Sequence, residues 1–234
     1  MSTTLEVVGL GRLAYGEALD LQRRVAEARL DRRFDHDLLL LVEHPPVVTL
    51  GRSFRPEHLS TPRAELEARG VEVYEIERGG DVTFHGPGQL VGYPIFDLTE
   101  HRKDLHWFLR QLEASLIDAL DEFGIPAERQ PGLTGVWTRG RKIASIGIHV
   151  RRWVTWHGFA LNVLTNLSYF DLIVPCGIDG VTMTSVKREL GENTPRDVWA
   201  RAADQVVLGF ARVFGQRPQA GNTNDLRNGL AGAG

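Results

Sequence analysis

The residue best suited to covalent chemistry in this chain is its single cysteine. Cys176 stands in the segment IVPCGIDG (173–180), between a proline and a glycine. A loop of this composition leaves a thiol accessible, and a thiolate is a strong nucleophile. The alternative is a buried, inert cysteine, because unpaired cysteines are among the most buried residues. One cysteine also excludes a disulfide within the chain.

A catalytic thiol needs a cation or a base beside it, and lysine usage in this chain is unusual. Only Lys103, Lys142 and Lys187 are lysines, and the other 24 of the 27 basic residues are arginines. Arginine does not release a proton, so a lysine in such a chain favours a role for an amine. The alternative is a surface lysine with no such role. The candidate activators of the thiol are Lys142, Lys187, His44, His85, His149 and His157.

The segment RGGDVTFHGPGQ (78–89) is the second region with chemical character. Four glycines and a proline surround the apolar stretch Val82–Phe84, so the backbone can lie against a ligand. The segment has neither the GxxxxGK[ST] nor the GxGxxG pattern of nucleotide-phosphate loops. The alternative is a pair of glycine-rich turns, in which His85 is a structural histidine.

Several function classes are excluded by missing patterns. The histidines and the lone cysteine lack metal-ligand spacing, and no GxSxG elbow is present. No apolar run is long enough to span a membrane, and the first 20 residues do not resemble a signal peptide. We expect a cytoplasmic protein that needs no metal or other cofactor and binds neither nucleic acid nor membrane.

The charge distribution suggests an acidic partner. The chain carries a formal charge of −3, yet residues 129–170 contain six basic residues and no acidic one. A basic segment in an acidic protein favours a local acidic partner. The alternative is a solvated pair of strands with arginines at their tips.

Hydrophobic periodicity predicts an α+β fold with mixed or antiparallel sheets and helices outside. We expect one domain over residues 1–214 and a flexible tail over residues 215–234. The predicted strands are 5–9, 37–43, 47–50, 71–77, 82–84, 90–98, 133–138, 141–151 and 153–163. The predicted helices are 15–33, 62–69, 104–123, 185–190 and 195–214, with Thr61 and Thr194 as caps.

Four segments together resemble the lipoyl(octanoyl) transferases. They are EHPPVVTLGR (43–52), RGGDVTFHGPGQLVGYP (78–94), RKIASIGIHV followed by HGFALNV (141–163), and IVPCGI followed by MTS (173–185). The resemblance implies the α+β fold shared by biotin and lipoate protein ligases, and a catalytic dyad of Cys176 and Lys142. Val48 departs from the family, whose members often carry an aromatic residue there, so one pocket wall is expected to differ.

The resemblance also implies a pocket for the acyl group. Its lining residues would be Arg78, Gly79, Gly80, Asp81, Val82, Thr83, Phe84, His85, Ser145, Ile146, Gly147, Gly158, Phe159 and Ala160. We expect the apolar stretch Val82–Phe84 to hold the acyl chain.

The implied reaction is the first step of protein lipoylation. Cys176 would take an octanoyl or lipoyl group from acyl carrier protein as a thioester, with backbone N–H groups of Cys176 or Gly177 stabilising the oxyanion. A lysine of a lipoyl domain would then receive the group. The implied acceptors are lipoyl domains of 2-oxoacid dehydrogenase complexes and the glycine cleavage H protein.

Two alternatives remain at this point. The first is an ATP-dependent lipoate- or biotin-protein ligase with the same fold. Sequences similar to RRxSGGG are typical of the equivalent loop in those ligases, which do not need the cysteine. The GPG after His85 and the presence of Cys176 in this chain argue against a ligase. The second alternative is a non-catalytic module that binds acyl carrier protein.

Overall fold

Apolar strands form the centre of a large mixed sheet in the computed structural model, which describes residues 3–177 and 180–231. The strand order is β11-β1-β2-β6-β10-β9-β8-β7. Parallel pairing joins β1 to β2 and β11, and the other neighbours are antiparallel. The predicted α+β fold is therefore confirmed. The strands are β1 (Thr4–Arg12), β2 (Asp37–Glu43), β6 (Gln89–Ile95), β7 (Glu128–Gln130), β8 (Leu133–Thr138), β9 (Arg141–Arg151), β10 (Val154–Asn162) and β11 (Arg217–Ala220).

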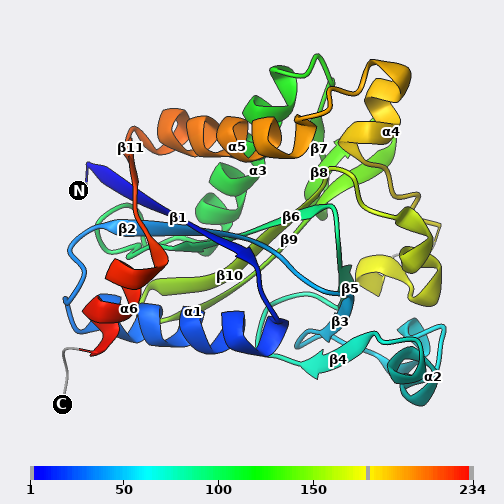
Figure 1. Cartoon of the computed structure of the whole chain (residues 1–234), viewed down its shortest axis with the longest axis horizontal. Coiled ribbons are helices and arrows are strands. Elements are labelled where there is room, and N and C mark those ends of the chain that lie inside the picture. The colour runs from blue at the N-terminus through cyan, green and yellow to red at the C-terminus, as the bar shows by residue number, and fades with distance from the viewer. Residues whose placement is uncertain (1–2, 178–179, 232–234) are drawn as a thin grey trace.

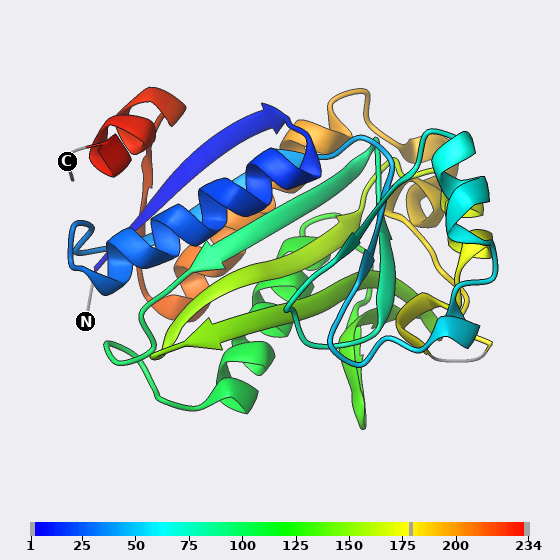
Figure 2. The same cartoon turned by 90° about the horizontal axis from the view of Figure 1, so that it is seen from below.

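Helices cover both faces of this sheet (Figures 1 and 2). On one face lie α3 (Leu105–Asp121) and α5 (Val198–Phe214), which pack on each other and supply Phe108, Leu112 and Phe210 to the core. On the other face lies α1 (Tyr15–Leu30), with α6 (Thr223–Ala231) beside it. Each helix therefore buries one apolar stripe against the sheet.

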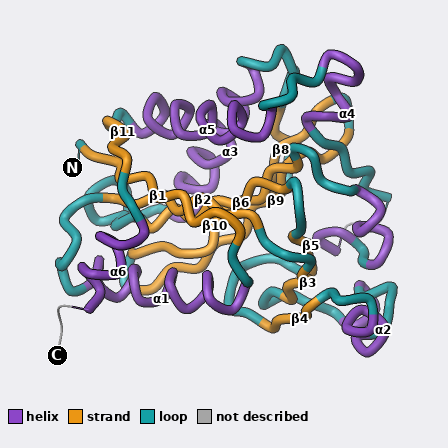
Figure 3. The backbone as a smooth tube through the Cα atoms, in the orientation of Figure 1, coloured by secondary structure: helices purple, strands orange, loops and turns teal. Residues whose placement is uncertain are grey.

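A second, three-stranded sheet adjoins one end of the large sheet (Figure 3). Its order is β4 (Glu72–Glu75), β3 (Val47–Leu50) and β5 (Val82–His85). Leu66 of α2 (Arg63–Ala68) is fully buried in the core beneath it. The remaining short elements are α4 (Val186–Leu190) and four 3-10 turns, η1 (Pro56–His58), η2 (Leu167–Leu172), η3 (Pro175–Gly177) and η4 (Gly191–Asn193).

Two predicted helix caps are wrong. Helix α5 begins at Val198, after Asp197, so Thr194 lies outside it, and its hydroxyl donates instead to the carbonyl of Gly191 at 2.6 Å. Pro62 has an extended ψ of 144° and is itself the residue before α2, so Thr61 lies outside the helix. The predicted start of α3 is confirmed, because Asp104 accepts a hydrogen bond from the Trp107 N–H at 3.0 Å.

The predicted flexible tail is wrong for the part of the tail that the structure describes. Strand β11 pairs in parallel with β1, and both Leu226 and Leu230 of α6 are buried in the core under α1. Edge-strand hydrogen bonds and buried leucines thus hold the segment in place. Residues 232–234 lie outside the described residues.

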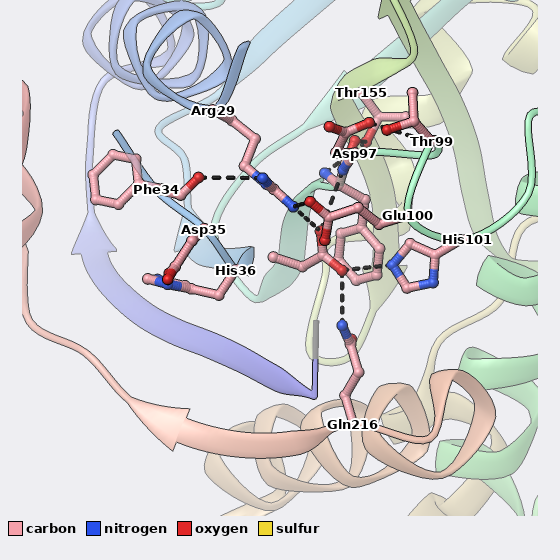
Figure 4. Close-up of polar contacts among 12 residues, drawn as sticks. Arg29, Phe34, Asp35, His36, Asp97, Thr99, Glu100, His101, Thr155 and Gln216 are labelled. Carbon is pink, nitrogen blue, oxygen red and sulfur yellow. Dashed lines mark hydrogen bonds and ion pairs between the residues drawn. The ribbon is translucent and has the colours of Figure 1, made fainter. Parts of the chain in front are cut away.

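A buried polar cluster also fixes the start of this C-terminal segment (Figure 4). Asp37, which is fully buried, accepts a hydrogen bond from Gln216 at 2.7 Å and lies 2.6 Å from the His101 ring nitrogen. Arg29 pairs with Glu100 at 2.9 Å and lies 3.6 Å from Asp37. The charge on Asp37 is therefore compensated inside the protein.

No helix in residues 3–177 or 180–231 is long and apolar enough to cross a membrane.

Candidate active site

Lys142 and Cys176 meet at the centre of the site. The Lys142 Nζ atom lies 3.0 Å from the Cys176 Sγ atom, and the Ser145 hydroxyl lies 3.9 Å from the same sulfur. The Lys142 side chain is buried and Cys176 is half-buried. An amine at this distance can stabilise a thiolate and exchange a proton with a group bound there.

Backbone contacts bring these two residues together from distant elements. Lys142 stands near the start of β9, where its N–H donates to Thr182 and its carbonyl accepts from Thr184, both at 2.9 Å. The Cys176 loop is held from its other side, because the Val174 N–H donates to the His58 carbonyl at 2.7 Å. Cys176 itself has a φ of +58°, a strained conformation for a non-glycine residue.

A glycine on β8 makes room for the lysine. Gly135 has a φ of +131°, and a Cβ atom there would lie 2.8 Å from the Lys142 Cε atom. Its N–H donates to the buried carboxylate of Glu113 at 3.1 Å, which ties β8 to α3. The Trp137 ring lies 5.4 Å from Nζ, a cation–π contact. No pattern in the sequence indicates that Gly135 or Glu113 contributes to the site.

The loop next to the cysteine packs against a His–Asp pair. His58 Nδ1 lies 2.7 Å from Asp81 Oδ2, and a Cβ atom on Gly177 would lie 2.7 Å from that oxygen. The Gly177 N–H already donates to the Val174 carbonyl at 2.9 Å. The expectation that Gly177 supplies an oxyanion donor is therefore wrong for this conformation.

A cavity of about 260 Å³ opens beside the pair. Cys176 and Lys142 line it together with most of the predicted pocket residues. Those are Arg78, Gly80, Asp81, Thr83, His85, Ser145, Ile146, Gly147, Gly158, Phe159 and Ala160.

Three predicted residues do not line the cavity, namely Gly79, Val82 and Phe84. Side chains alternate along β5, so Thr83 and His85 face the cavity while Val82 and Phe84 face the opposite side. There Phe84 stacks on Tyr169 at 4.6 Å, in the core that also holds Val48. Of the stretch Val82–Phe84, which is expected to hold the acyl chain, only Thr83 therefore lines the cavity, and Val48 does not line it.

Gly79 contributes through its backbone. Its N–H donates to the Ile148 carbonyl at 2.9 Å, which fastens the 78–81 segment to the end of β9. The glycine on the facing strand is equally constrained, because a Cβ atom on Gly147 would lie 2.7 Å from the Gly79 carbonyl oxygen.

Seven lining residues were not among the predicted pocket residues, although one of them, His157, was a candidate activator of the thiol. Tyr15 opens α1, Val91 and Tyr93 share one face of β6, and His157 lies on β10. The other three are at the start of β8 and just before it: Gly132, Leu133 and Thr134. The alternation of β6 points to Val91 and Tyr93 as a pair, but only the fold shows which face meets the cavity.

Burial keeps the histidines of this region neutral. Desolvation lowers the pKa of His85 to about 3 and that of His44 to about 4, from 6.5. Desolvation also raises the pKa values of Tyr15 and Tyr93 above their ordinary range. At neutral pH, these four side chains carry no charge.

Arg78 carries a buried positive charge into the cavity wall. Its guanidinium donates to the Thr49 carbonyl at 2.7 Å and to the Thr49 hydroxyl at 2.9 Å. Burial lowers the pKa of Arg78, while nearby Cys176 and Asp81 act to raise it. The guanidinium therefore places a positive charge in the wall of the cavity.

The predicted basic segment does not form one surface. Arg139 and Arg141 pair with Glu189, Arg129 pairs with Glu113, and Lys142 is buried at the site. Arg151 and Arg152 are exposed at the far hairpin of β9 and β10. The segment therefore gives no continuous docking face for an acidic partner.

Within residues 3–177 and 180–231, no group of three or more His, Cys, Asp or Glu side chains is arranged to hold a metal ion.

Comparisons with known proteins agree with this geometry. Residues 14–207 match the model of the lipoyl protein ligase A/B catalytic domain. An octanoyltransferase of Solibacter usitatus is 54% identical over 206 residues, which cover 88% of this chain and 90% of that protein. An octanoyltransferase of Myxococcus xanthus is 46% identical over 217 residues, which cover 90% of this chain and only 60% of that longer protein.

Solved structures show the same fold at low identity. A lipoate-protein ligase A bound with ATP has a TM-score of 0.75 at 15% identity, covering 99% of this chain and 93% of that one. The bipartite lipoate protein ligase of an archaeal lipoylation system, described with its E2 lipoyl domain from Thermoplasma acidophilum, has a TM-score of 0.74 at 16% identity. It covers 99% of this chain and 91% of that one.

The chain therefore belongs to the lipoyl protein ligase A/B catalytic domain family. Within that family it groups with the octanoyltransferases, and it is an acyltransferase of protein lipoylation.

Proposed function

We propose that this enzyme moves an octanoyl or lipoyl group from acyl carrier protein to a lysine of a lipoyl domain, through a thioester on Cys176. The observation that carries this proposal is the 3.0 Å contact between Lys142 Nζ and Cys176 Sγ in the wall of the cavity. The acceptors are lipoyl domains of 2-oxoacid dehydrogenase complexes and the glycine cleavage H protein. The Thermoplasma ligase that shares the fold is described with an E2 lipoyl domain, which supports an acceptor of this kind.

The first half-reaction forms the acyl-enzyme. The Cys176 thiolate attacks the carbonyl carbon of the carrier thioester, and the new C–S bond produces a tetrahedral oxyanion. The adduct collapses when the carrier sulfur leaves, and this sulfur takes a proton from the Lys142 ammonium. A thioester is exchanged for a thioester, so no ATP is needed.

The second half-reaction forms the amide. An uncharged lysine amine of the lipoyl domain attacks the Cys176 thioester, and the neutral Lys142 amine accepts the proton that this nitrogen must lose. Cys176 then leaves as a thiolate beside the Lys142 ammonium, which restores the starting state. Amide formation from a thioester runs downhill.

Two further side chains support the negative charge of both adducts. The Arg78 guanidinium lies in the cavity wall with its charge buried, where charge–charge interactions are strong. The Ser145 hydroxyl lies 3.9 Å from Sγ, from where it can donate toward the developing oxyanion. These groups replace the Gly177 N–H, which is already occupied.

Intact-protein mass spectrometry tests the thioester. The protein is mixed briefly with octanoyl-acyl carrier protein without ATP, as wild type and as Cys176→Ala. We expect a gain of one octanoyl group, removable by hydroxylamine, in the wild type only. Octanoyl transfer by Cys176→Ala at the wild-type rate would overturn the proposal.

The same assay separates the alternatives. A ligase would modify the lipoyl domain only when free octanoate and ATP replace the carrier. A binding module would retain octanoyl-carrier without forming an adduct or modifying the acceptor. Either outcome contradicts the proposed reaction.

Replacing the amine tests the proton transfer. Lys142→Met keeps the length of the side chain and removes the group that exchanges protons, so we expect kcat to fall by about 10²- to 10⁴-fold. Lys103→Met is the matched control, because Lys103 is exposed and away from the cavity. Equal rates for the two variants would remove Lys142 from the mechanism.

A further inference from the structure

The cavity has a far end, about one acyl chain away from the sulfur. Ser145, beside Cys176, pairs across the sheet with Ala160, and Ala160 pairs with Val91. These three side chains share one face, and two strand spacings of about 4.8 Å place Val91 about 10 Å from Ser145. An extended eight-carbon chain with bonds of about 1.5 Å covers about 9 Å. The end of an octanoyl group on Cys176 would therefore lie close to Val91 and to the cavity wall beside it.

That wall is polar, although the chain end it would meet is apolar. We call it the distal subsite, formed by Tyr15, His85 and Tyr93. Tyr15 and His85 stack with ring planes 6° apart and centroids 6.0 Å apart, and both line the cavity. Tyr93 is held from behind, since its hydroxyl is hydrogen-bonded to His44 Nε2 at 2.7 Å.

Tyr15 presents an unused donor to the cavity. The residue as a whole is only 2% exposed and lines the cavity, and its hydroxyl makes no hydrogen bond with any residue that the structure describes. A hydroxyl that lines a cavity without a protein partner is normally satisfied by water or by a ligand. The hydroxyl is therefore available to a ligand atom.

His85 presents an unused acceptor beside it. Its Nδ1 atom lies 2.8 Å from the Gln89 Oε1 atom. The amide of Gln89 is oriented by its own NH2 group, which donates to Asn162 Oδ1 at 2.9 Å and to the Phe84 carbonyl at 3.2 Å. Gln89 Oε1 must therefore accept, which assigns the proton to His85 Nδ1 and leaves Nε2 as a bare acceptor.

We propose that the distal subsite binds a hydroxyl group at the far end of a medium-chain acyl group, so that 8-hydroxyoctanoyl thioesters are substrates. The terminal hydroxyl accepts from the Tyr15 hydroxyl and donates to His85 Nε2. This inference rests on the proposed acyl transfer and names a substrate class for the same cavity. A hydroxyl is suited to this pair because it donates and accepts at once.

An apolar group of the same size does not suit the subsite. The ninth carbon of a nonanoyl chain occupies the position of the terminal oxygen, and it leaves Tyr15 and His85 buried without partners. The same wall limits an apolar chain to eight carbons. A longer chain would bury the polar atoms of Tyr15 and His85 without partners, and this costs more free energy than leaving the space of one methylene group unfilled.

A competition experiment tests the subsite. Equimolar 8-hydroxyoctanoyl- and nonanoyl-acyl carrier protein, which have equally long acyl groups, are mixed with the enzyme, and the acyl-enzyme masses are compared. We expect the hydroxylated group to be favoured about 10-fold in the wild type, because it forms two hydrogen bonds, with Tyr15 and with His85, that a nonanoyl group cannot form. Tyr15→Phe should reduce this preference at least threefold, and Tyr169→Phe, which alters a tyrosine outside the cavity, should not.

The outcomes separate a failure of the distal subsite from a failure of the proposed acyl transfer. A wild-type ratio near one, or an undiminished ratio in Tyr15→Phe, overturns the distal subsite while leaving the acyl transfer intact. The absence of any adduct with octanoyl-carrier contradicts the proposed function instead. If Tyr15→Phe does not fold, calorimetric titration of the wild type with 8-hydroxyoctanamide and with nonanamide compares the two chain ends without any reaction. Equal affinities there would also overturn the proposal.

Discussion

The buried carboxylate of Glu113 holds the backbone of Gly135, and Gly135 borders Lys142. The Gly135 N–H donates to Glu113 Oε1 at 3.1 Å, while Arg110 and Arg129 pair with the other carboxylate oxygen at 2.6 and 3.1 Å. Since a Cβ atom at Gly135 would lie 2.8 Å from the Lys142 Cε atom, the position of β8 decides where the amine lies. Glu113 thus acts on the site through β8 without touching it.

Glu113→Ala should weaken both the fold and the reaction. The substitution leaves the Gly135 N–H without an acceptor, so we expect the free energy of unfolding to fall by about 1–3 kcal/mol. Glu113→Gln keeps a carbonyl oxygen and should lose less. Urea unfolding and steady-state kcat measure the two effects, with exposed Glu122→Ala as the control. If Glu113→Ala were as stable and active as that control, β8 would not depend on this contact.

Gly177→Ala should disable the cysteine loop. Gly177 has a φ of +64°, and its new Cβ atom would lie 2.7 Å from Asp81 Oδ2 and 2.8 Å from His58 Cε1. The loop must move, and a displacement near 1 Å of a reacting group costs about a hundredfold in rate. Gly180→Ala is the matched control, because Gly180 has a similar φ of +74° with nothing within 4 Å of its Cβ position. We expect kcat/KM to fall in Gly177→Ala only, and similar losses in both variants would assign the effect to backbone strain.

Stability should fall as the pH drops below about 6.5. Burial lowers the pKa values of His44 to about 4 and His85 to about 3, so between these values and 6.5 the unfolded chain binds protons that the folded chain does not. Each histidine then contributes a slope of up to about 1.4 kcal/mol per pH unit, with stability rising toward neutral pH.

Urea unfolding between pH 5 and 7 measures this slope. Burial lowers the pKa of His157 as well, so His85→Gln should remove only part of the slope, and His106→Gln, at an exposed position, should leave it unchanged. A slope that is unaltered in His85→Gln would show that His85 is not the group responsible.

The C-terminal helix should contribute to stability. Leu226 is 1% exposed and packs under α1, so Leu226→Ala should lower the free energy of unfolding by about 2–5 kcal/mol. Leu208 on α5 is 41% exposed, and Leu208→Ala should change the free energy of unfolding by less than about 0.5 kcal/mol. Thermal or urea unfolding compares them, and equal, small losses would indicate a weakly held C-terminal segment.

The amino-acid sequence determined most of the elements and singled out the two residues of the proposed reacting pair. Strong periodicity places α1, α3 and the central strands within a few residues, since a helix or strand that buries one face must repeat its apolar residues regularly. The reacting pair also stands out by type, because Cys176 is the only thiol and Lys142 is one of three lysines. The contact between them is set by the fold, since 34 positions separate the two residues.

Tertiary structure alone decided the orientation of the pocket and the order of the C-terminal segment. Alternation along β5 divides its residues between two faces, and only packing against the Tyr169 ring shows that Phe84 turns away from the cavity. Tyr15 lines the cavity because α1 begins beside it, and β11 is held in place because it pairs with the edge of β1. These contacts join residues far apart in the chain, whereas local periodicity reports only which residues share a face.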